Sequence, residues 1–416
     1  MLSGGYANID TATRIRCEKV MNTGTVLRMF SGRSRWNLQP NEFSLAIERQ
    51  RSSASGVLDL TASNPTTVGF DYDEEAILSA MNNRKSLTYE PDPRGLLSAR
   101  EAVVHYYNEV LPAADIDERC LILTVSTSEA YSYAFRLLCD PGDEILVAAP
   151  SYPLFEYLAE IQDVQLVSYE LVYDHGWQID FHSLRQKLTA RTRAIVLVNP
   201  NNPTGSYISG QEKTELNQIA AEDNLALIVD EVFLDFALDG ARHFSLFANQ
   251  DALTFTLSGI SKICALPQMK LSWLAVSGPA QQKREAMDRL EVIADTYLSP
   301  SAPIQHALGT LLETRAGIQT QITGRLRQNL AELDRQLAAQ QLCSRLQVQG
   351  GWYAVLRVPV TQSDEQLATE LVEQQSVVVH PGHFFDFHVD GYLIVSLITP
   401  EREFSEGIRR VLSFFH

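Results

Sequence analysis

The chain has 416 residues, 45% of them hydrophobic, and a formal net charge of -17. A chain of this length exceeds the size at which a single hydrophobic core usually stops growing, so we expect two domains. The acidic balance argues against nucleic acid or an anionic membrane surface as a partner, because both are bound through clustered Lys and Arg.

The beginning of the chain gives little sign of a folded element. Residues 1–28 are polar and lack the apolar stretch of a signal peptide, and we predict that they form a disordered extension. No apolar run in the chain approaches the roughly 20 residues that span a bilayer. The five cysteines have no C-x-x-C spacing, so neither a disulfide framework nor a zinc site is indicated. We therefore expect a cytoplasmic enzyme or small-molecule binder.

Six short apolar runs then follow one another, with helix-like segments such as 128–139 and 211–222 between them. Runs rich in Val, Ile and Leu are typical of strands that are buried on both faces of a parallel sheet. We therefore predict an α/β fold with a mostly parallel sheet flanked by helices. The predicted strands are Cys120–Val125, Glu144–Ala149, Ala194–Val198, Leu225–Val229, Thr254–Leu257 and Leu271–Val276.

The pattern changes after Leu298. Residues 303–341 form a long segment that is compatible with a helix and charged on one face. The mixture of this segment with later short strands predicts a smaller α+β unit. Those strands are expected at Trp352–Val358, Val377–Val379 and Leu393–Leu397.

The residues that follow the strands of the large sheet are polar and chemically varied. In chain order they include the hydroxyl run Ser126–Ser128, Tyr152, the sequence NNPTG at 201–205, Asp230, and SGISK ending at Lys262. Each alone has an ordinary structural explanation, as a helix N-cap or a turn. Because ligands bind beyond the carboxyl ends of parallel strands, we expect these side chains to converge on one crevice.

Together these groups match the requirements of pyridoxal phosphate. The set contains an amine for a Schiff base, a carboxylate that keeps the ring nitrogen protonated, and an amide that reaches the phenolic oxygen. It also contains an aromatic ring that stacks on the cofactor and a helix N-terminus that binds its phosphate. This combination predicts a pyridoxal-phosphate enzyme.

Over about residues 29–416 the chain resembles the aminotransferase class I/II family of fold-type I pyridoxal-phosphate enzymes. The strongest motifs are NNPTG at 201–205, DEVF at 230–233 and SGISK at 258–262. The resemblance implies that Lys262 forms the internal aldimine, Asp230 pairs with the ring nitrogen and Asn202 hydrogen-bonds the phenolic oxygen. It also implies a cis peptide bond between Asn202 and Pro203.

The resemblance implies further cofactor contacts. Tyr152 is expected to stack on the ring, and Ser126 and Thr127 to bind the phosphate. Tyr89, in YEPDPRG, is similar to a tyrosine that reaches the phosphate of the neighbouring subunit, so we expect a homodimer with shared active sites. Lys270 falls where most members have an arginine on the phosphate, and a lysine can serve there as a point charge. The alternative for Lys270 is an ordinary solvated charge.

The family fold also implies a domain division. We expect a large cofactor-binding domain at residues 60–315 with a sheet of the seven-stranded type. The smaller α+β domain is expected to combine the two chain ends, residues 29–59 and 316–416.

Two positions depart from the family pattern. Many members have a tyrosine that donates a hydrogen bond to the phenolic oxygen, and this chain has Phe233 at that position. The missing donor predicts an internal aldimine that stays protonated to higher pH. Ile394 takes the place of an arginine that holds the α-carboxylate of the substrate. Either another arginine substitutes, with Arg33, Arg35 and Arg357 as candidates, or the substrate is not held by its α-carboxylate.

Two further features of the sequence bear on the substrate class and on metal binding. Thr296 is not an arginine of the kind that selects a second carboxylate, so aspartate-like substrates are disfavoured. The histidines of HPGHFFDFH suggest a metal site, but the Pro-Gly between His380 and His383 prevents a shared helix face. We therefore predict that His380, His383 and His388 hold no metal. We regard His383 as a candidate for the substrate pocket.

The function predicted from these residues is transamination between an amino acid and a 2-oxo acid. The substrate amine displaces Lys262, which then moves a proton as a free amine, while Asp230 keeps the ring an electron sink. The same chemistry permits a lyase, a decarboxylase or a cyclase, and the fold alone does not decide among them. A non-catalytic cofactor-binding regulator is the least favoured alternative, because the segment before Phe30 is too short for a DNA-binding module.

Overall fold

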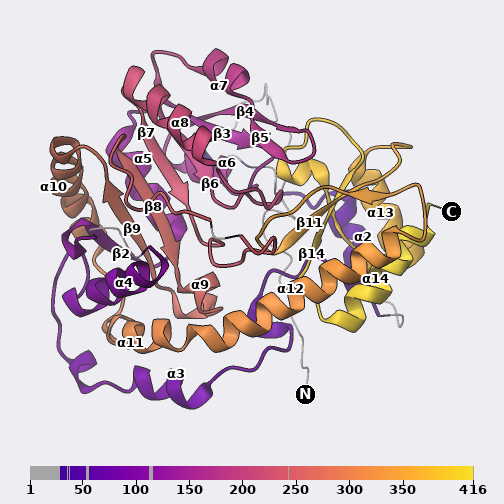
Figure 1. The fold of residues 1–416 in the computed structure, drawn as a ribbon, viewed down its shortest axis with the longest axis horizontal. Helices are drawn as coiled ribbons and strands as arrows, with labels where there is room; N and C mark the ends of the chain where they lie inside the picture. Colours follow the sequence, from indigo (N-terminus) through magenta and orange to yellow (C-terminus); the bar gives the residue numbers. More distant parts are fainter. Residues whose placement is uncertain are drawn as a thin grey trace.

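The structure of the protein is a computed structural model that describes residues 29–34, 36, 38–52, 56–111, 116–241 and 243–415. A large eight-stranded sheet with helices on both faces lies beside a smaller sheet with its own helices (Figure 1). The chain is therefore α/β, as predicted from the apolar runs. The extension predicted at residues 1–28 lies outside the described residues.

The large sheet has the strand order β2-β9-β8-β7-β6-β3-β4-β5. The pairs from β8 through β7, β6 and β3 to β4 are parallel, whereas β9 is antiparallel to both its neighbours and β5 is antiparallel to β4. All six predicted strands of this sheet are present. The strands are β2 (Leu121–Thr124), β3 (Glu144–Ala149), β4 (Gln165–Tyr173), β5 (Trp177–Ile179), β6 (Thr192–Val198), β7 (Ala226–Asp230), β8 (Thr254–Gly259) and β9 (Ser272–Ser277).

Strands β4 and β5 escape the prediction, and they make the sheet eight-stranded instead of seven-stranded. They lie at the edge of the sheet, where only Tyr169 of β4 is fully buried. An edge strand that is only partly covered has no continuous apolar run, which is why the search for such runs misses both strands.

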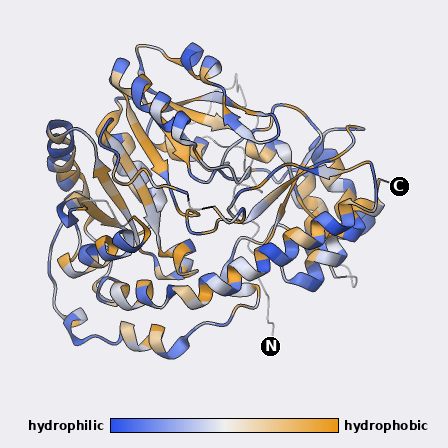
Figure 2. Ribbon diagram, viewed as in Figure 1, coloured by the Kyte–Doolittle hydropathy of each residue, from blue (hydrophilic) through white to orange (hydrophobic). Residues whose placement is uncertain are grey.

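Helices cover both faces of the large sheet and bury alternate residues of its strands. Ile145 and Val147 of β3 belong to a core with α5, α6 and α10, whereas Leu146 and Ala148 face α7 and α8. A third core packs α3, α4 and α11 against β2 and β9. Figure 2 shows the hydrophobic residues gathered on the strands and the hydrophilic ones on the outer helices. These helices are α3 (Glu74–Met81), α4 (Leu97–Val110), α5 (Thr127–Leu138), α6 (Phe155–Ile161), α7 (Phe181–Lys187), α8 (Gly210–Glu222), α10 (Ala280–Tyr297) and α11 (Ala302–Glu313).

The smaller unit joins the two ends of the described chain. Its four-stranded antiparallel sheet has the order β10-β11-β14-β13, and a separate parallel pair joins β1 to β12. One continuous core contains residues of α2, α12, α13 and α14. The strands are β1 (Leu58–Asp59), β10 (Ser344–Arg345), β11 (Tyr353–Arg357), β12 (Val377–Val378), β13 (His380–Pro381) and β14 (Tyr392–Ser396), and the helices are α2 (Glu42–Arg51), α12 (Arg315–Leu337), α13 (Asp364–Gln375) and α14 (Glu401–Ser413).

The helical segment predicted at residues 303–341 is two helices, α11 and α12, which meet at Thr314. Helix α12 runs from beside the large sheet to the smaller unit, where it packs against α14 (Figure 1). It therefore connects the two units physically. Within the described residues, no helix combines the length and the hydropathy that crossing a membrane requires.

Candidate active site

A cavity of about 170 Å³ lies between the carboxyl ends of the large-sheet strands and the smaller unit. Five of the residues predicted from the sequence line it together: Thr127, Tyr152, Asn202, Asp230 and Lys262. They come from α5, from the segments after β3 and β6, from the end of β7 and from α9 (Ile260–Ile263). The parallel strands thus bring side chains from distant parts of the sequence to one crevice.

Lys262 places its amine at the wall of this cavity. Its Nζ lies 3.5 Å from the carbonyl oxygen of Ser63, 4.7 Å from the ring centre of Trp352 and 5.4 Å from that of Phe233. The two rings offer cation–π contacts to the ammonium group. Lys262 lines the cavity, where its amine can form a covalent bond with a ligand.

Asp230 is buried at the end of β7, and burial raises the pKa of its carboxyl group to about 6. Hydrogen bonds from the Val232 amide at 3.1 Å and the Tyr131 hydroxyl at 3.2 Å, together with the charge of Lys262, act in the opposite direction and favour the ionised form. A buried carboxylate with only neutral donors is under-compensated, and it favours a cationic ligand.

Tyr131 is a residue that the sequence reasoning missed. It lies on α5, four residues after Thr127 and so on the same helix face. Burial holds the pKa of its hydroxyl well above the ordinary value, so Tyr131 stays a donor to Asp230. The spacing from the predicted phosphate-binding residue is the signal that could have identified it.

Asn202 lies in the NNPTG turn, where the Asn202-Pro203 bond is cis, as are Asn199-Pro200 just before the turn and Ala149-Pro150 after β3. The cis bond predicted before Pro203 is confirmed. Asn201 supports the turn by donating to the Pro150 carbonyl at 3.1 Å and to the Thr204 hydroxyl at 2.9 Å. By contrast, the buried Oδ1 of Asn202 has no hydrogen-bond partner. An orphaned buried amide on a cavity wall is expected to bind a polar group of a ligand.

The start of helix α5 forms another part of the wall. Ser126 is its N-cap, and its Oγ accepts a hydrogen bond from the Glu129 amide at 3.2 Å, so the side chain has the ordinary capping role. Thr127, the next residue, does line the cavity. The first amide groups of a helix lack intrahelical acceptors, and they attract an anion such as a phosphate.

Three of the predicted cofactor residues do not line this cavity: the capping residue Ser126, Lys270 and Tyr89. Lys270 is exposed, with a left-handed backbone φ of 54°, and Tyr89 is 74% exposed. Since Tyr89 is expected to act on a neighbouring subunit, its place outside the cavity of its own chain is consistent with that role. All three assignments stay predictions.

No arginine lines the cavity among the described residues. Arg33 forms an exposed ion pair with Asp163 at 2.8 Å, and Arg357 is exposed at the end of β11. Neither lines the cavity of its own chain, and their role in place of the arginine that the family has at Ile394 stays a prediction. Arg35 lies outside the described residues.

The three histidines of HPGHFFDFH lie in different surroundings. His388 Nε2 lies 3.0 Å from Glu170, and His383 Nε2 lies 4.0 Å from Glu365. Of the three, only His380 lines the cavity, and a place for His383 in the substrate pocket stays a prediction. In the part of the chain that the structure describes, no group of three or more His, Cys, Asp or Glu side chains is arranged to hold a metal ion.

The described residues fit pyridoxal phosphate. The under-compensated Asp230 suits a protonated ring nitrogen, and the unpartnered Oδ1 of Asn202 can accept a hydrogen bond from the phenolic hydroxyl of the cofactor. The α5 N-terminus suits the phosphate, and Lys262 supplies the amine for the covalent bond.

Comparisons with known proteins agree with this geometry. The family model for aminotransferase class I and II matches residues 55–411. The chain is 28% identical over 380 residues to the glutamate-pyruvate aminotransferase AlaA of Haemophilus influenzae, covering 88% of this chain and 92% of that protein. It is 24% identical over 410 residues to human tyrosine aminotransferase, covering 93% of this chain and 89% of that protein.

Solved structures give the same result for the fold. An aminotransferase from Escherichia coli superposes with a TM-score of 0.81 at 25% identity, covering 90% of this chain and 94% of that one. The alanine aminotransferase of Pyrococcus furiosus also gives 0.81, at 24% identity, covering 89% of this chain and 95% of that one.

The fold and the site together define a fold-type I pyridoxal-phosphate enzyme. More narrowly, the chain belongs to the aminotransferase class I and II family, and it is a pyridoxal-phosphate-dependent transaminase.

Proposed function

We propose that this aminotransferase transfers the amino group of an amino acid with an uncharged side chain to a 2-oxo acid, as a cytoplasmic homodimer. The observation that carries the proposal is the meeting of the Lys262 amine and the buried Asp230 carboxyl in one cavity. Transamination needs both groups, one to bind the cofactor and move a proton and the other to hold the ring protonated.

Each residue has a definite task in this reaction. Pyridoxal phosphate, when bound, supplies an electron sink that stabilises negative charge at the substrate α-carbon. Lys262 would hold the cofactor through Nζ and, once released, accept and return the α-proton at Nζ. Asp230 keeps a proton on the ring nitrogen, and Tyr131 keeps Asp230 in place. Tyr152 would cover the ring and exclude water from it.

The opposite wall supports a preference for uncharged side chains. It is lined by Ile47 and Val378 and by the aromatic residues Tyr353, Phe384 and Phe385. An ionised side chain that lost its water against these groups would be left uncompensated. The names of the relatives, alanine, glutamate-pyruvate and tyrosine aminotransferases, agree with amino acids as the substrate class.

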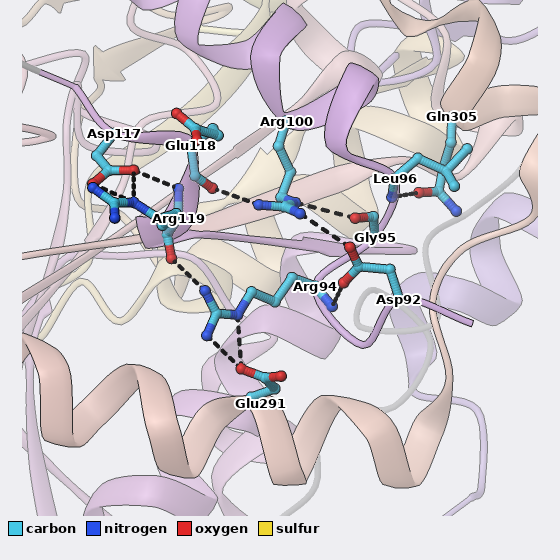
Figure 3. Close-up of polar contacts among 10 residues, drawn as sticks. All are labelled: Asp92, Arg94, Gly95, Leu96, Arg100, Asp117, Glu118, Arg119, Glu291 and Gln305. Carbon is cyan, nitrogen blue, oxygen red and sulfur yellow. Dashed lines mark hydrogen bonds and ion pairs between the residues drawn. The ribbon is translucent and has the colours of Figure 1, made fainter. Parts of the chain in front are cut away.

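The segment that carries Tyr89 supports the homodimer. The Arg100 side chain donates to the Asp92 carboxylate at 3.0 Å, to the Gly95 carbonyl at 3.1 Å and to the Glu118 carbonyl at 3.0 Å (Figure 3). These bonds fasten the YEPDPRG segment to α4 just after Tyr89. An exposed aromatic ring beside a fastened segment is suited to contact a second copy of the chain.

Further anchors hold the same segment from the other side. Arg94 pairs with Glu291 of α10, and the Leu96 amide donates to the Gln305 side chain of α11 at 2.6 Å (Figure 3). The large domain therefore holds the segment that directly follows Tyr89.

The test of the reaction is an absorbance scan of the purified protein with pyridoxal phosphate, mixed with single amino acids while the products are assayed. Formation of pyridoxamine phosphate and a 2-oxo acid supports transamination, and the Lys262→Ala variant should show neither. Release of ammonia or carbon dioxide without pyridoxamine phosphate would instead establish a lyase or a decarboxylase, and a cyclic product would establish a cyclase.

The assembly and the compartment have separate tests. Light scattering of the cofactor-loaded protein should give twice the chain mass. Mixing inactive Lys262→Ala with a Tyr89→Phe variant of weakened phosphate affinity should restore one complete site per heterodimer. A monomer that is fully active would refute the shared site. A fluorescent fusion of the full chain reports the compartment.

A further inference from the structure

His380 is a polar side chain on the small-domain wall whose Nδ1 has no hydrogen-bond partner and which the transamination chemistry does not use. Its Nδ1 is buried and makes no hydrogen bond, and the residue lines the cavity. Phe384 and Phe385 present their rings to it, with ring centres 6.4 Å and 5.6 Å away. A buried nitrogen without a partner on a cavity wall indicates a ligand group that completes it.

The charge balance of the cavity identifies that group. Among the described residues, Lys262 is the only Lys or Arg in the lining, and the proposed function commits its amine to the cofactor. An amino acid also brings an α-carboxylate, which needs a charged or hydrogen-bonding partner once it leaves water. On the small-domain wall, His380 is the side chain that can become a cation, and its Cα pairs in register with that of Ile394.

We propose that His380 binds the α-carboxylate of the substrate as a conditional cation, neutral while no anion is present and protonated when the carboxylate lies against it. This inference rests on the proposed function and adds to it the group that holds the substrate. It replaces the permanent charge of an arginine with a charge that appears only in the complex.

The surroundings of His380 support a neutral resting state. Burial lowers the pKa of its imidazole to about 4, and the negative charge of Asp59 on β1 opposes that effect only in part. Asp59 is occupied, since its carboxylate accepts from Arg51 of α2 at 3.1 Å and from the Thr61 amide at 2.9 Å.

Other charged groups near His380 do not supply its missing partner. His383 of the turn at 382–385 lies beside Glu365 of α13, and Asp230 lies on the large-domain side of the cavity. The neighbouring strand β14 contributes Ile394, which carries no charge. An arriving carboxylate would therefore be the first anion in direct contact with the ring.

The proposed role of His380 predicts the direction in which carboxylate affinity changes with pH. An opposite charge within about 4–6 Å raises the pKa of a basic group by about 1–3. Carboxylate binding then takes up a proton at pH values between the free and the bound pKa. Affinity is highest at low pH, where His380 is already charged, and it falls as the pH rises through that interval.

The experiment uses the cofactor-loaded full chain and two matched probes, 3-phenylpropanoate and its uncharged amide. Calorimetric titration at pH 6 in two buffers with different ionisation enthalpies gives the number of protons taken up. We expect uptake with the carboxylate and none with the amide, and an affinity for the carboxylate that falls about 2- to 80-fold between pH 5 and pH 8.

Variants separate His380 from other titrating groups. His380→Gln should remove the uptake, remove the pH dependence and weaken the carboxylate about tenfold without affecting the amide. His383→Gln, three residues away with a side chain 34% exposed, should behave as wild type. Since the cofactor can titrate too, the difference between wild type and His380→Gln measures the contribution of His380.

The wild-type proton count needs no variant, so a His380→Gln protein that failed to fold would leave the test intact. Carboxylate binding without proton uptake, or binding no tighter than that of the amide, would overturn the proposal. The absorbance of the bound cofactor before titration reports on Lys262 separately. Its loss would reject the proposed function and not the role of His380.

Discussion

The buried carboxyl of Asp230 is expected to destabilise the cofactor-free protein, and Asp230→Asn should relieve that cost. The pKa of the folded carboxyl, about 6, lies above its ordinary value of 3.8. The protonated group therefore stabilises the fold fully below pH 3.8, and this contribution is lost as the pH rises through about 6. The difference in pKa corresponds to about 3 kcal/mol at pH 8.

The asparagine keeps the shape of the side chain and an oxygen for the Val232 amide, but it carries no charge to desolvate. A second carboxyl contributes in the same direction. Burial raises the pKa of Glu231 to about 7, and the charge of Asp230 adds to that effect, so the variant relieves both groups. The advantage should be small at pH 4 and grow to its full value above pH 7.

Urea unfolding of the cofactor-free protein at pH 4, 6 and 8 measures this difference. The exposed Asp71, changed to asparagine, is the control and should leave stability unchanged at every pH. With cofactor the order should reverse, because the variant lacks the anion for the ring nitrogen. Equal stability of wild type and Asp230→Asn at pH 8 without cofactor would refute the reasoning.

Three further substitutions test neighbouring contacts. Tyr131→Phe removes one donor to ionised Asp230 and should raise the pKa of Asp230 by about 1–2. As the pH is lowered, cofactor affinity should then begin to fall at a higher pH than in wild type. Tyr133→Phe on the same helix should leave this pH dependence unchanged. Phe233→Tyr should lower the spectroscopic pKa of the bound cofactor by about 1, and an unchanged value would reject a role for the missing donor. Arg100→Met leaves the Gly95 and Glu118 carbonyls without their donor and should cost about 3–5 kcal/mol in the free energy of unfolding, which chemical denaturation measures.

Much of the large domain could be predicted because its strands are buried on both faces. The six predicted strands of the large sheet follow from continuous runs of Val, Ile and Leu, and the parallel order places Asp230 and Lys262 at one edge. The contribution of the smaller unit could not be obtained in this way. Its residues His380 and Tyr353 reach the cavity only through tertiary packing against the large domain, which no local pattern in the chain specifies.

Nothing in the local sequence distinguishes His380 from the two neighbouring histidines. The histidines of HPGHFFDFH attract attention as a group, yet the turn at 382–385 separates them, and only the one without a partner enters the cavity. A sequence does not show which polar atoms packing will leave unpaired.

Some of the buried atoms without partners lie at the site. Asn202 Oδ1 and His380 Nδ1 are both buried without hydrogen-bond partners, and the buried carboxyl of Asp230 has too few donors to compensate its charge. All three residues line the same cavity. Each costs stability in the cofactor-free chain, since a buried polar group without a partner loses its hydration for nothing. A cofactor and an anionic substrate would complete all three. The fold therefore keeps a local instability where binding can remove it, and ligand binding should stabilise this protein more than its contact area alone predicts.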